Sequence, residues 1–232
     1  MMLRWTIALA ALGFGLLSGC TILQSNSQPP APESPASSPS NAPTAPTVAS
    51  PVVSLPPNGR PDTRVMPMTI EGTVVEIELN LFDKAPLPFT TYVPTQDFQS
   101  EVNESEQGTV SQFFFSPKGK KDQTAYVQIF LPARQTSLEE MRRLLLDESG
   151  LLASNRWSLV DRTNIVSYSW ASEKLIYQQK TDKQNFVGSI YIGDYKGRAF
   201  YALTHYPAEY TDGFEPRSTI MLENLQFRDE QF

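Results

Sequence analysis

Residues 186–206 read Phe186-Val-Gly-Ser-Ile-Tyr-Ile192, then Gly193-Asp-Tyr-Lys-Gly197, then Ala199-Phe-Tyr-Ala-Leu-Thr-His-Tyr206 after one arginine. Two runs rich in aromatic and β-branched residues flank a short turn segment that has a glycine at each end, and this order is typical of a β-hairpin. Strands joined by so short a connection pair antiparallel. The stretch therefore predicts a pair of antiparallel strands.

Further strands are expected both before and after a helical segment of the sequence. Apolar and polar side chains alternate from Val75 to Leu81, which indicates a half-buried strand, or a hairpin that turns near Glu71 and Gly72. Other short runs rich in aromatic and β-branched residues are bounded by proline, glycine or polar turn residues. The expected strands are residues 68–82, 89–93, 111–116, 124–131, 157–160 and 174–179.

Two helices are expected, at about 137–148 and about 216–224. Ser137-Leu-Glu-Glu140 has the form of a capping box, and apolar residues recur at helical spacing from Leu138 to Leu145. Gly150 is placed to end this helix, and Pro216 is placed to begin the second one. Because the strands and helices are segregated along the chain, we predict an α+β fold whose antiparallel sheet is packed by both helices.

The N-terminal part of the chain has a different composition. Eleven of the 19 prolines lie between Pro29 and Pro61, among serine, alanine and threonine. Such a segment buries too little apolar surface to offset the entropy of the chain, and its prolines favour an extended spacer. We therefore expect a tether over residues 20–64 and a single globular domain over residues 65–232.

The first 19 residues read as a secretory signal peptide. Arg4 precedes an apolar run from Trp5 to Leu17, which is too short for a membrane-spanning helix. Leu17-Ser18-Gly19-Cys20 resembles the lipobox of bacterial lipoproteins, and Cys20 is the only cysteine of the chain. The resemblance implies cleavage before Cys20, lipidation of Cys20, and export across the cytoplasmic membrane to a periplasmic face or a thylakoid lumen. Thr21 does not decide which membrane holds the anchor.

The domain also resembles a known family. Phe89-Thr-Thr-Tyr-Val-Pro94 followed by Asp97-Phe98, the helix after Thr136, the hairpin through Gly197 and the closing helix come in the order of the PsbP-like proteins. Members are extrinsic proteins of the photosynthetic oxygen-evolving complex and their relatives, and the cyanobacterial branch is lipidated. The resemblance implies a structural or assembly role near a membrane complex. The leading strand, residues 68–82, is extra, and no matching set of metal ligands is present.

The charge and residue types exclude several classes of protein. The chain has 19 basic and 25 acidic side chains, and removal of residues 1–19 takes away Arg4, which changes the net charge from −6 to −7. An acidic domain does not carry the positive surface that nucleic-acid binding requires. One histidine and one lipidated cysteine do not make the usual zinc sites, and no phosphate-binding or dinucleotide motif is present. We predict no catalytic, cofactor-binding or metal-binding residues.

Three features leave alternatives open. His205 is interpreted as a packing or surface residue, with a triad base as the alternative. Asp97, Glu101, Glu104 and Glu106 are interpreted as a solvated acidic loop, with weak calcium binding as the alternative. At least one of the three consecutive phenylalanines 113–115 must point away from the core face, either under a helix or into a ligand groove. Tyr168 and Trp170 share a face.

Three classes of function compete. The first is a non-enzymatic lipoprotein that is tethered to a membrane through acyl chains on Cys20 and binds or assembles a protein partner there. The alternative is a carrier for a lipid or small apolar ligand, held between sheet and helix. The third is a hydrolase built around His205. A substitution such as His205→Ala that leaves the function unchanged would eliminate this class.

Overall fold

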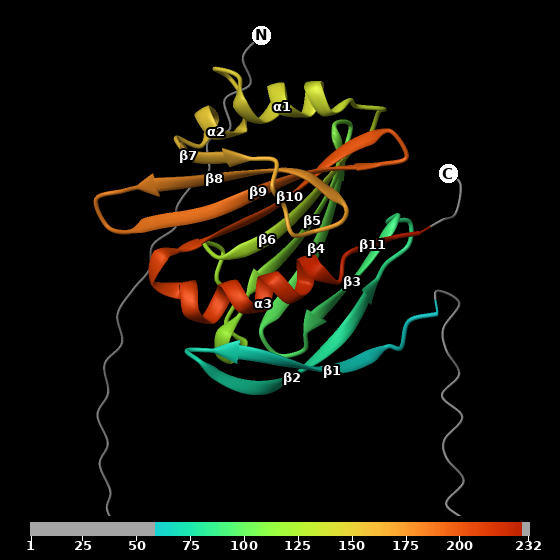
Figure 1. Ribbon diagram of the computed structural model, residues 1–232, viewed down its shortest axis with the longest axis vertical. Coiled ribbons are helices and arrows are strands. Elements are labelled where there is room, and N and C mark those ends of the chain that lie inside the picture. Colours follow the sequence, from blue (N-terminus) through green and yellow to red (C-terminus); the bar gives the residue numbers. More distant parts are fainter. Residues whose placement is uncertain (1–58, 229–232) are drawn as a thin grey trace, which may run out of the picture. The chain divides into compact units, whose positions relative to one another are not determined.

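The computed structural model describes residues 59–228, which contain two antiparallel sheets and three α-helices (Figure 1). Cys20, the predicted signal peptide and nearly all of the predicted tether lie outside these residues. The first strand begins at Thr63, just inside the expected tether.

The larger sheet has seven strands, all paired antiparallel, in the order β4-β5-β6-β10-β9-β8-β7. Its strands are β4 (Phe98–Ser105), β5 (Gly108–Phe115), β6 (Tyr126–Pro132), β7 (Ser158–Thr163), β8 (Ala171–Lys180), β9 (Asn185–Tyr195) and β10 (Arg198–Pro207). The predicted hairpin joins β9 to β10, with Arg198 opposite Tyr195 and Pro207 opposite Phe186. The predicted hairpin is therefore confirmed.

The smaller sheet has four strands in the order β1-β2-β3-β11. Its strands are β1 (Thr63–Ile70), β2 (Thr73–Asp83), β3 (Phe89–Pro94) and β11 (Gln226–Phe227). Of the two alternatives for residues 68–82, the hairpin that turns at Glu71 and Gly72 is present, and both residues have positive φ, as a tight hairpin turn requires.

Three helices and two 3₁₀ turns complete the described chain. They are η1 (Pro117–Gly119), α1 (Leu138–Leu146), α2 (Leu151–Ser154), η2 (Ala208–Tyr210) and α3 (Thr211–Glu223). The first expected helix is confirmed, but it ends at Leu146, and Gly150 precedes α2 instead of ending α1. The second expected helix begins five residues earlier than predicted, and Pro216 lies inside it.

The elements stack in four layers: α1 with α2, the seven-stranded sheet, α3, and the sheet of β1, β2, β3 and β11 (Figure 1). Met141 and Leu145 of α1 pack with Leu175, Tyr177 and other residues on one face of the large sheet. Phe214, Met221 and Leu222 of α3 pack with residues of its other face, while Ile220 packs with Leu79 and Tyr92 of the small sheet. The α+β fold packed by helices is therefore confirmed, with α3 buried between two sheets.

Candidate functional site

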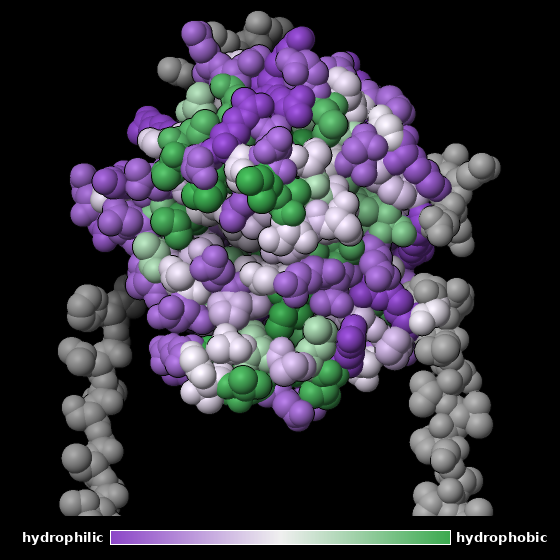
Figure 2. Space-filling view, viewed as in Figure 1, coloured by the Kyte–Doolittle hydropathy of each residue, from purple (hydrophilic) through white to green (hydrophobic). Residues whose placement is uncertain are grey.

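The outermost strand of the large sheet, β7, exposes apolar side chains. It pairs with β8 on one side, and no strand of residues 59–228 pairs with its other side. Leu159 and Val160 are 45% and 57% exposed, and Ile165, which follows the strand, is 85% exposed. Figure 2 shows apolar surface gathered over β7 and the segment after it. Natural sheets usually protect such an edge, so this strand is a candidate docking surface.

The opposite edge of the sheet, β4, is built differently. The sequence predicted an acidic loop here, but the residues form a strand that pairs with β5, and Glu101 and Glu104 lie exposed on it. Asp97 is bound by Arg217 Nε of α3 at 2.7 Å, and Glu101 pairs with Lys121. In residues 59–228 no three histidine, cysteine, aspartate or glutamate side chains are placed to hold a metal ion. Charged residues on this edge discourage strand pairing.

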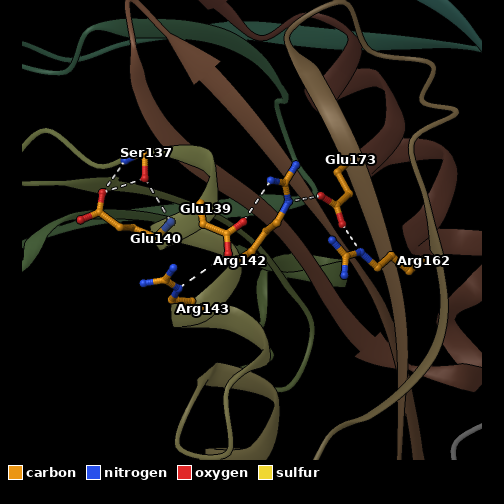
Figure 3. Close-up of polar contacts among 7 residues, drawn as sticks. All are labelled: Ser137, Glu139, Glu140, Arg142, Arg143, Arg162 and Glu173. Atoms are coloured by element: carbon orange, nitrogen blue, oxygen red, sulfur yellow. Dashed lines mark hydrogen bonds and ion pairs between the residues drawn. The ribbon is translucent and has the colours of Figure 1, made fainter.

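A buried carboxylate fixes β7 and α1 to the same point of the sheet (Figure 3). Glu173 lies where the pairing of β8 with β9 shifts register, and it is 4% exposed. Its Oε2 accepts a hydrogen bond from Arg142 Nε of α1 at 2.7 Å, and its Oε1 accepts one from Arg162 Nε of β7. Burial by itself raises the pKa of Glu173, but the hydrogen bonds and charges of the two arginines outweigh burial and lower it.

The capping box predicted at the start of α1 sets the direction of this helix. Ser137 Oγ accepts from the backbone N–H of Glu140 at 3.2 Å, and Glu140 Oε2 accepts from the backbone N–H of Ser137 at 2.8 Å (Figure 3). The reciprocal bonds satisfy two backbone donors that a helix start otherwise leaves free. With its first turn fixed, α1 presents Arg142 toward Glu173 (Figure 3).

His205 is a packing residue inside an aromatic cluster. Its ring stacks on Trp157 and Phe186 at centroid distances of 5.0 and 5.1 Å, and the side chain is 7% exposed. Its Nδ1 lies 3.0 Å from the hydroxyl of Tyr177, which donates to the carbonyl of Thr204. Because the single hydroxyl hydrogen of Tyr177 goes to that carbonyl, Nδ1 carries the ring proton. The hydrogen bond of His205 thus goes to a phenol and not to a serine or a carboxylate.

Burial lowers the pKa of His205 to about 4, because removal from water disfavours the charged ring. The imidazole is therefore neutral at neutral pH. The same surroundings raise the pKa of Tyr126 to about 12 through burial. The stacked rings of this cluster thus carry no charge at neutral pH.

A pocket of about 440 Å³ opens where the β2–β3 connection meets the ends of β5 and β6 and the β9–β10 turn. Its apolar wall is formed by Pro86, Leu87, Pro88, Leu131, Pro132 and Ala133. The volume lies within the range of small-molecule sites in proteins. The carrier alternative placed a cavity between sheet and helix, whereas this pocket lies at the end of the strands.

Polar groups gather on one side of the same pocket. They are Thr109, Gln135, Tyr195, Lys196 and Arg198, and no lining residue in the described part of the chain is acidic. Gln135 Nε2 donates to the carbonyl of Gly197 at 2.6 Å, which ties the turn to the chain after β6. Arg198 is half-buried and forms no ion pair with any residue of 59–228. Sequence reasoning missed this pocket because its walls come from four separate segments.

The remaining aromatic residues pack within the core. Phe113 and Phe115 face the α3 side, while Phe114 faces the other side, with Lys121 Nζ 3.9 Å from its ring centroid. A lysine side chain thus covers Phe114, in place of the expected helix or groove. Tyr168 and Trp170 stack at 5.3 Å, as their shared face predicted, and Trp170 Nε1 donates to the carbonyl of Leu222 at 3.0 Å.

Among residues 59–228 no helix is both long and apolar enough to cross a membrane.

Comparison with known proteins finds likeness among solved structures only. No family model matches the chain, and no curated protein matches it. The solution structure of cyanobacterial PsbP (CyanoP) from Synechocystis sp. PCC 6803 aligns with a TM-score of 0.44 and 7% identity, over 64% of this chain and 92% of that one. It agrees with a weak PsbP-like resemblance and carries no argument about function.

Two further structures align at similar levels. A crystal structure from Bacteroides thetaiotaomicron VPI-5482 gives a TM-score of 0.40 at 15% identity. The alignment covers 65% of this chain and 48% of that one, so this chain spans about half the length of that protein. The protein of unknown function PA94 from Pseudomonas aeruginosa gives 0.37 at 12% identity, over 66% of this chain and 99% of that one.

Proposed function

We propose that the chain is a non-enzymatic lipoprotein, anchored in a membrane through acyl chains on Cys20, that binds or assembles a membrane-associated protein complex. The observation that carries the proposal is the apolar edge strand β7, with Leu159, Val160 and Ile165 exposed. The order of elements that resembles the PsbP-like family points to the same class of role. The predicted tether of residues 20–64 supplies reach between the membrane and the domain.

The edge strand suits a partner that contributes an extended, apolar segment. The outer side of β7 offers main-chain hydrogen-bonding groups, and main-chain pairing of this kind supports recognition by added strands. Apolar side chains next to that edge would then set specificity for the partner. The ion pair of Arg162 with buried Glu173 holds β7 in place, so little ordering is required when a partner binds.

The test is cross-linking and affinity purification of the full lipidated chain from its own membranes. A double variant, Val160→Glu with Ile165→Glu, places two charges on the proposed surface. The matched control is Val74→Glu on β2, which is 67% exposed and lies in the other sheet. We expect one stoichiometric complex with the natural chain and the control, and at least about tenfold less with the double variant.

Equal recovery with the double variant would place the partner elsewhere on the domain and contradict the role of β7. No complex with any variant would contradict the assembly function itself. All of these sites are solvent-exposed, so the substitutions change the free energy of unfolding by less than about 0.5 kcal/mol. Thermal unfolding of each variant checks that the effect is one of binding.

The pocket at the β2–β3 connection favours a second candidate function, that of a carrier for a small apolar ligand. Two features of the pocket support this function: its volume of about 440 Å³ and its apolar wall. Recovery of the protein with a small molecule in the extract, and without a partner protein, would support this second function over the first.

A further inference from the structure

The pocket at the β2–β3 connection has an apolar side and a cationic side. Leu87 and Leu131, which are 3% and 8% exposed, belong to the main core, so the apolar side is rigid. Pro86, Pro88 and Pro132 add apolar surface without donating backbone hydrogen bonds. A ligand portion that contacts this side must therefore be apolar.

The cationic side is formed by the β9–β10 turn. Lys196 and Arg198 line the pocket there, and none of its lining residues within 59–228 is acidic. The turn is held by Gln135 Nε2 donating to Gly197 O at 2.6 Å and by Ala199 N–H donating to Thr136 O at 2.7 Å. Arg198 is half-buried and pairs with no carboxylate of residues 59–228, whereas three other half-buried arginines, 142, 217 and 228, each do.

A half-buried guanidinium without a carboxylate has lost part of its hydration and gained no ion pair. An arginine in this state is suited to a planar anion, which it binds through two parallel N–H donors. A cationic head would meet Arg198 with like charge, and a neutral head would leave Arg198 without a counter-charge.

From these observations we propose that the pocket binds an anionic amphiphile, a molecule with one apolar chain and a carboxylate or phosphate head, and that Arg198 pairs with the head. The chain lies against the leucine and proline wall, and the head lies at the β9–β10 turn. The proposal rests on the carrier function, and it needs no contact with the partner surface on β7.

The test is photo-cross-linking of the full chain in its membranes with a dodecanoate that carries a diazirine on its chain. Digestion and mass spectrometry then locate the label. We expect it on the peptides that contain residues 86–88 or 131–133. Excess dodecanoate or dodecyl phosphate should compete for the site, and excess dodecanol should not, while a difference between the two anions identifies the preferred head.

Two pocket variants and one control separate binding from folding. Arg198→Gln should reduce the labelling of these peptides about tenfold, which corresponds to about 1.4 kcal/mol. Ala133→Trp, at an exposed lining position, should reduce it by filling the pocket. Lys183→Gln removes the same charge in the exposed β8–β9 turn and should leave labelling unchanged.

Three results would overturn the proposal: label outside the two peptides, equal competition by dodecanol, or full labelling of Arg198→Gln. The double variant at Val160 and Ile165 should label normally. Loss of partner binding and loss of amphiphile binding are therefore distinguishable outcomes.

Discussion

At the residue scale, the neutral, buried His205 makes stability depend on pH. Burial lowers its pKa to about 4 in the folded chain, against about 6.5 when unfolded. Between these values the unfolded state binds more protons, so stability rises with pH across this window and is lost as pH falls from about 6.5 to about 4. This difference in the pKa of His205 corresponds to a loss of at most about 3 kcal/mol in the free energy of unfolding across the window.

We expect His205→Phe, which keeps a ring among Trp157, Phe186 and Tyr177, to flatten the dependence in that window. Urea unfolding at pH 7, 6, 5 and about 4.5 measures it through the change in midpoint. An unchanged slope for His205→Phe would mean that the ring of His205 is reached by water and titrates normally. The same variant also tests the hydrolase alternative, because a hydrolase built around His205 would lose its activity at neutral pH in His205→Phe.

Glu173 is the second residue whose ionisation supports the fold. Replacing it by glutamine removes the charge that faces Arg142 and Arg162, which we expect to lower the free energy of unfolding by about 1–2 kcal/mol. This loss is smaller than the loss expected for a fully buried ion pair, because the side chains of Arg142 and Arg162 are 32% and 48% exposed. The measurement is the urea midpoint at pH 7.

The pH dependence of this effect has a defined sign. The pKa of Glu173 is lowered in the fold, so its contribution is complete above the ordinary pKa of a glutamate and is lost as pH falls through the folded value. Glu173→Gln should therefore approach the natural chain in stability on the acid side of about pH 4. Glu139→Gln, whose carboxylate is 62% exposed, is the control and should change little at any pH.

At the scale of the element, α1 depends on its capping box. Ser137→Ala removes the acceptor for the backbone N–H of Glu140 and should lower the free energy of unfolding by about 1 kcal/mol. Because α1 carries Arg142, the loosened first turn should also weaken the bond to Glu173. A double-mutant cycle of Ser137→Ala with Glu173→Gln measures this coupling, and strictly additive effects would show that the two are independent.

Two elements differ from what local patterns indicate. The strand β4 contains Glu101 and Glu104, and its acidic composition resembles a loop, yet pairing with β5 along its whole length makes it a strand. The helix α3 begins before Pro216 because Phe214, with 0% exposure, packs against Phe98, Phe115 and Tyr206 and draws the preceding turn into the helix. In both cases partners distant in the sequence override local preference.

At the scale of the whole molecule, the layers share side chains and should unfold together. Trp157 reports on the core under α1 and α2, where it stacks on Tyr177 at 4.2 Å. Trp170 reports on the core around α3, through its bond to Leu222. In Trp157→Phe and in Trp170→Phe, the fluorescence transition should coincide with the loss of far-ultraviolet circular dichroism, as a two-state domain requires.

A fluorescence transition that precedes the loss of circular dichroism in one variant alone would mean that the layers unfold separately. The expected cooperativity comes from α3, which packs on both sheets: Thr91 Oγ1 of β3 donates to Met221 O at 2.5 Å, and Arg217 binds Asp97. Trp5 lies in the predicted signal peptide, and the predicted cleavage before Cys20 would remove it from the readout.

The sequence by itself determined the local elements. Alternation of apolar side chains, glycine turns and the Ser137–Glu140 cap are properties of short segments. They predicted the β9–β10 hairpin and α1, and they gave the β1–β2 turn as one of two alternatives. The lipobox at Cys20 likewise depends only on adjacent residues, and it stays a prediction. The α+β class followed from the order of these elements.

Only the tertiary structure decided which residues meet across the chain. The bonds of Glu173 to Arg142 and Arg162 span 31 and 11 residues, and the pocket beside Arg198 gathers four segments between Pro86 and Arg198. The exposure of β7 depends on its place at the end of the strand order, which no local pattern encodes. The physical reason is that burial and pairing are set by the packing of distant side chains, whereas turns, caps and strand alternation are set by neighbours along the backbone.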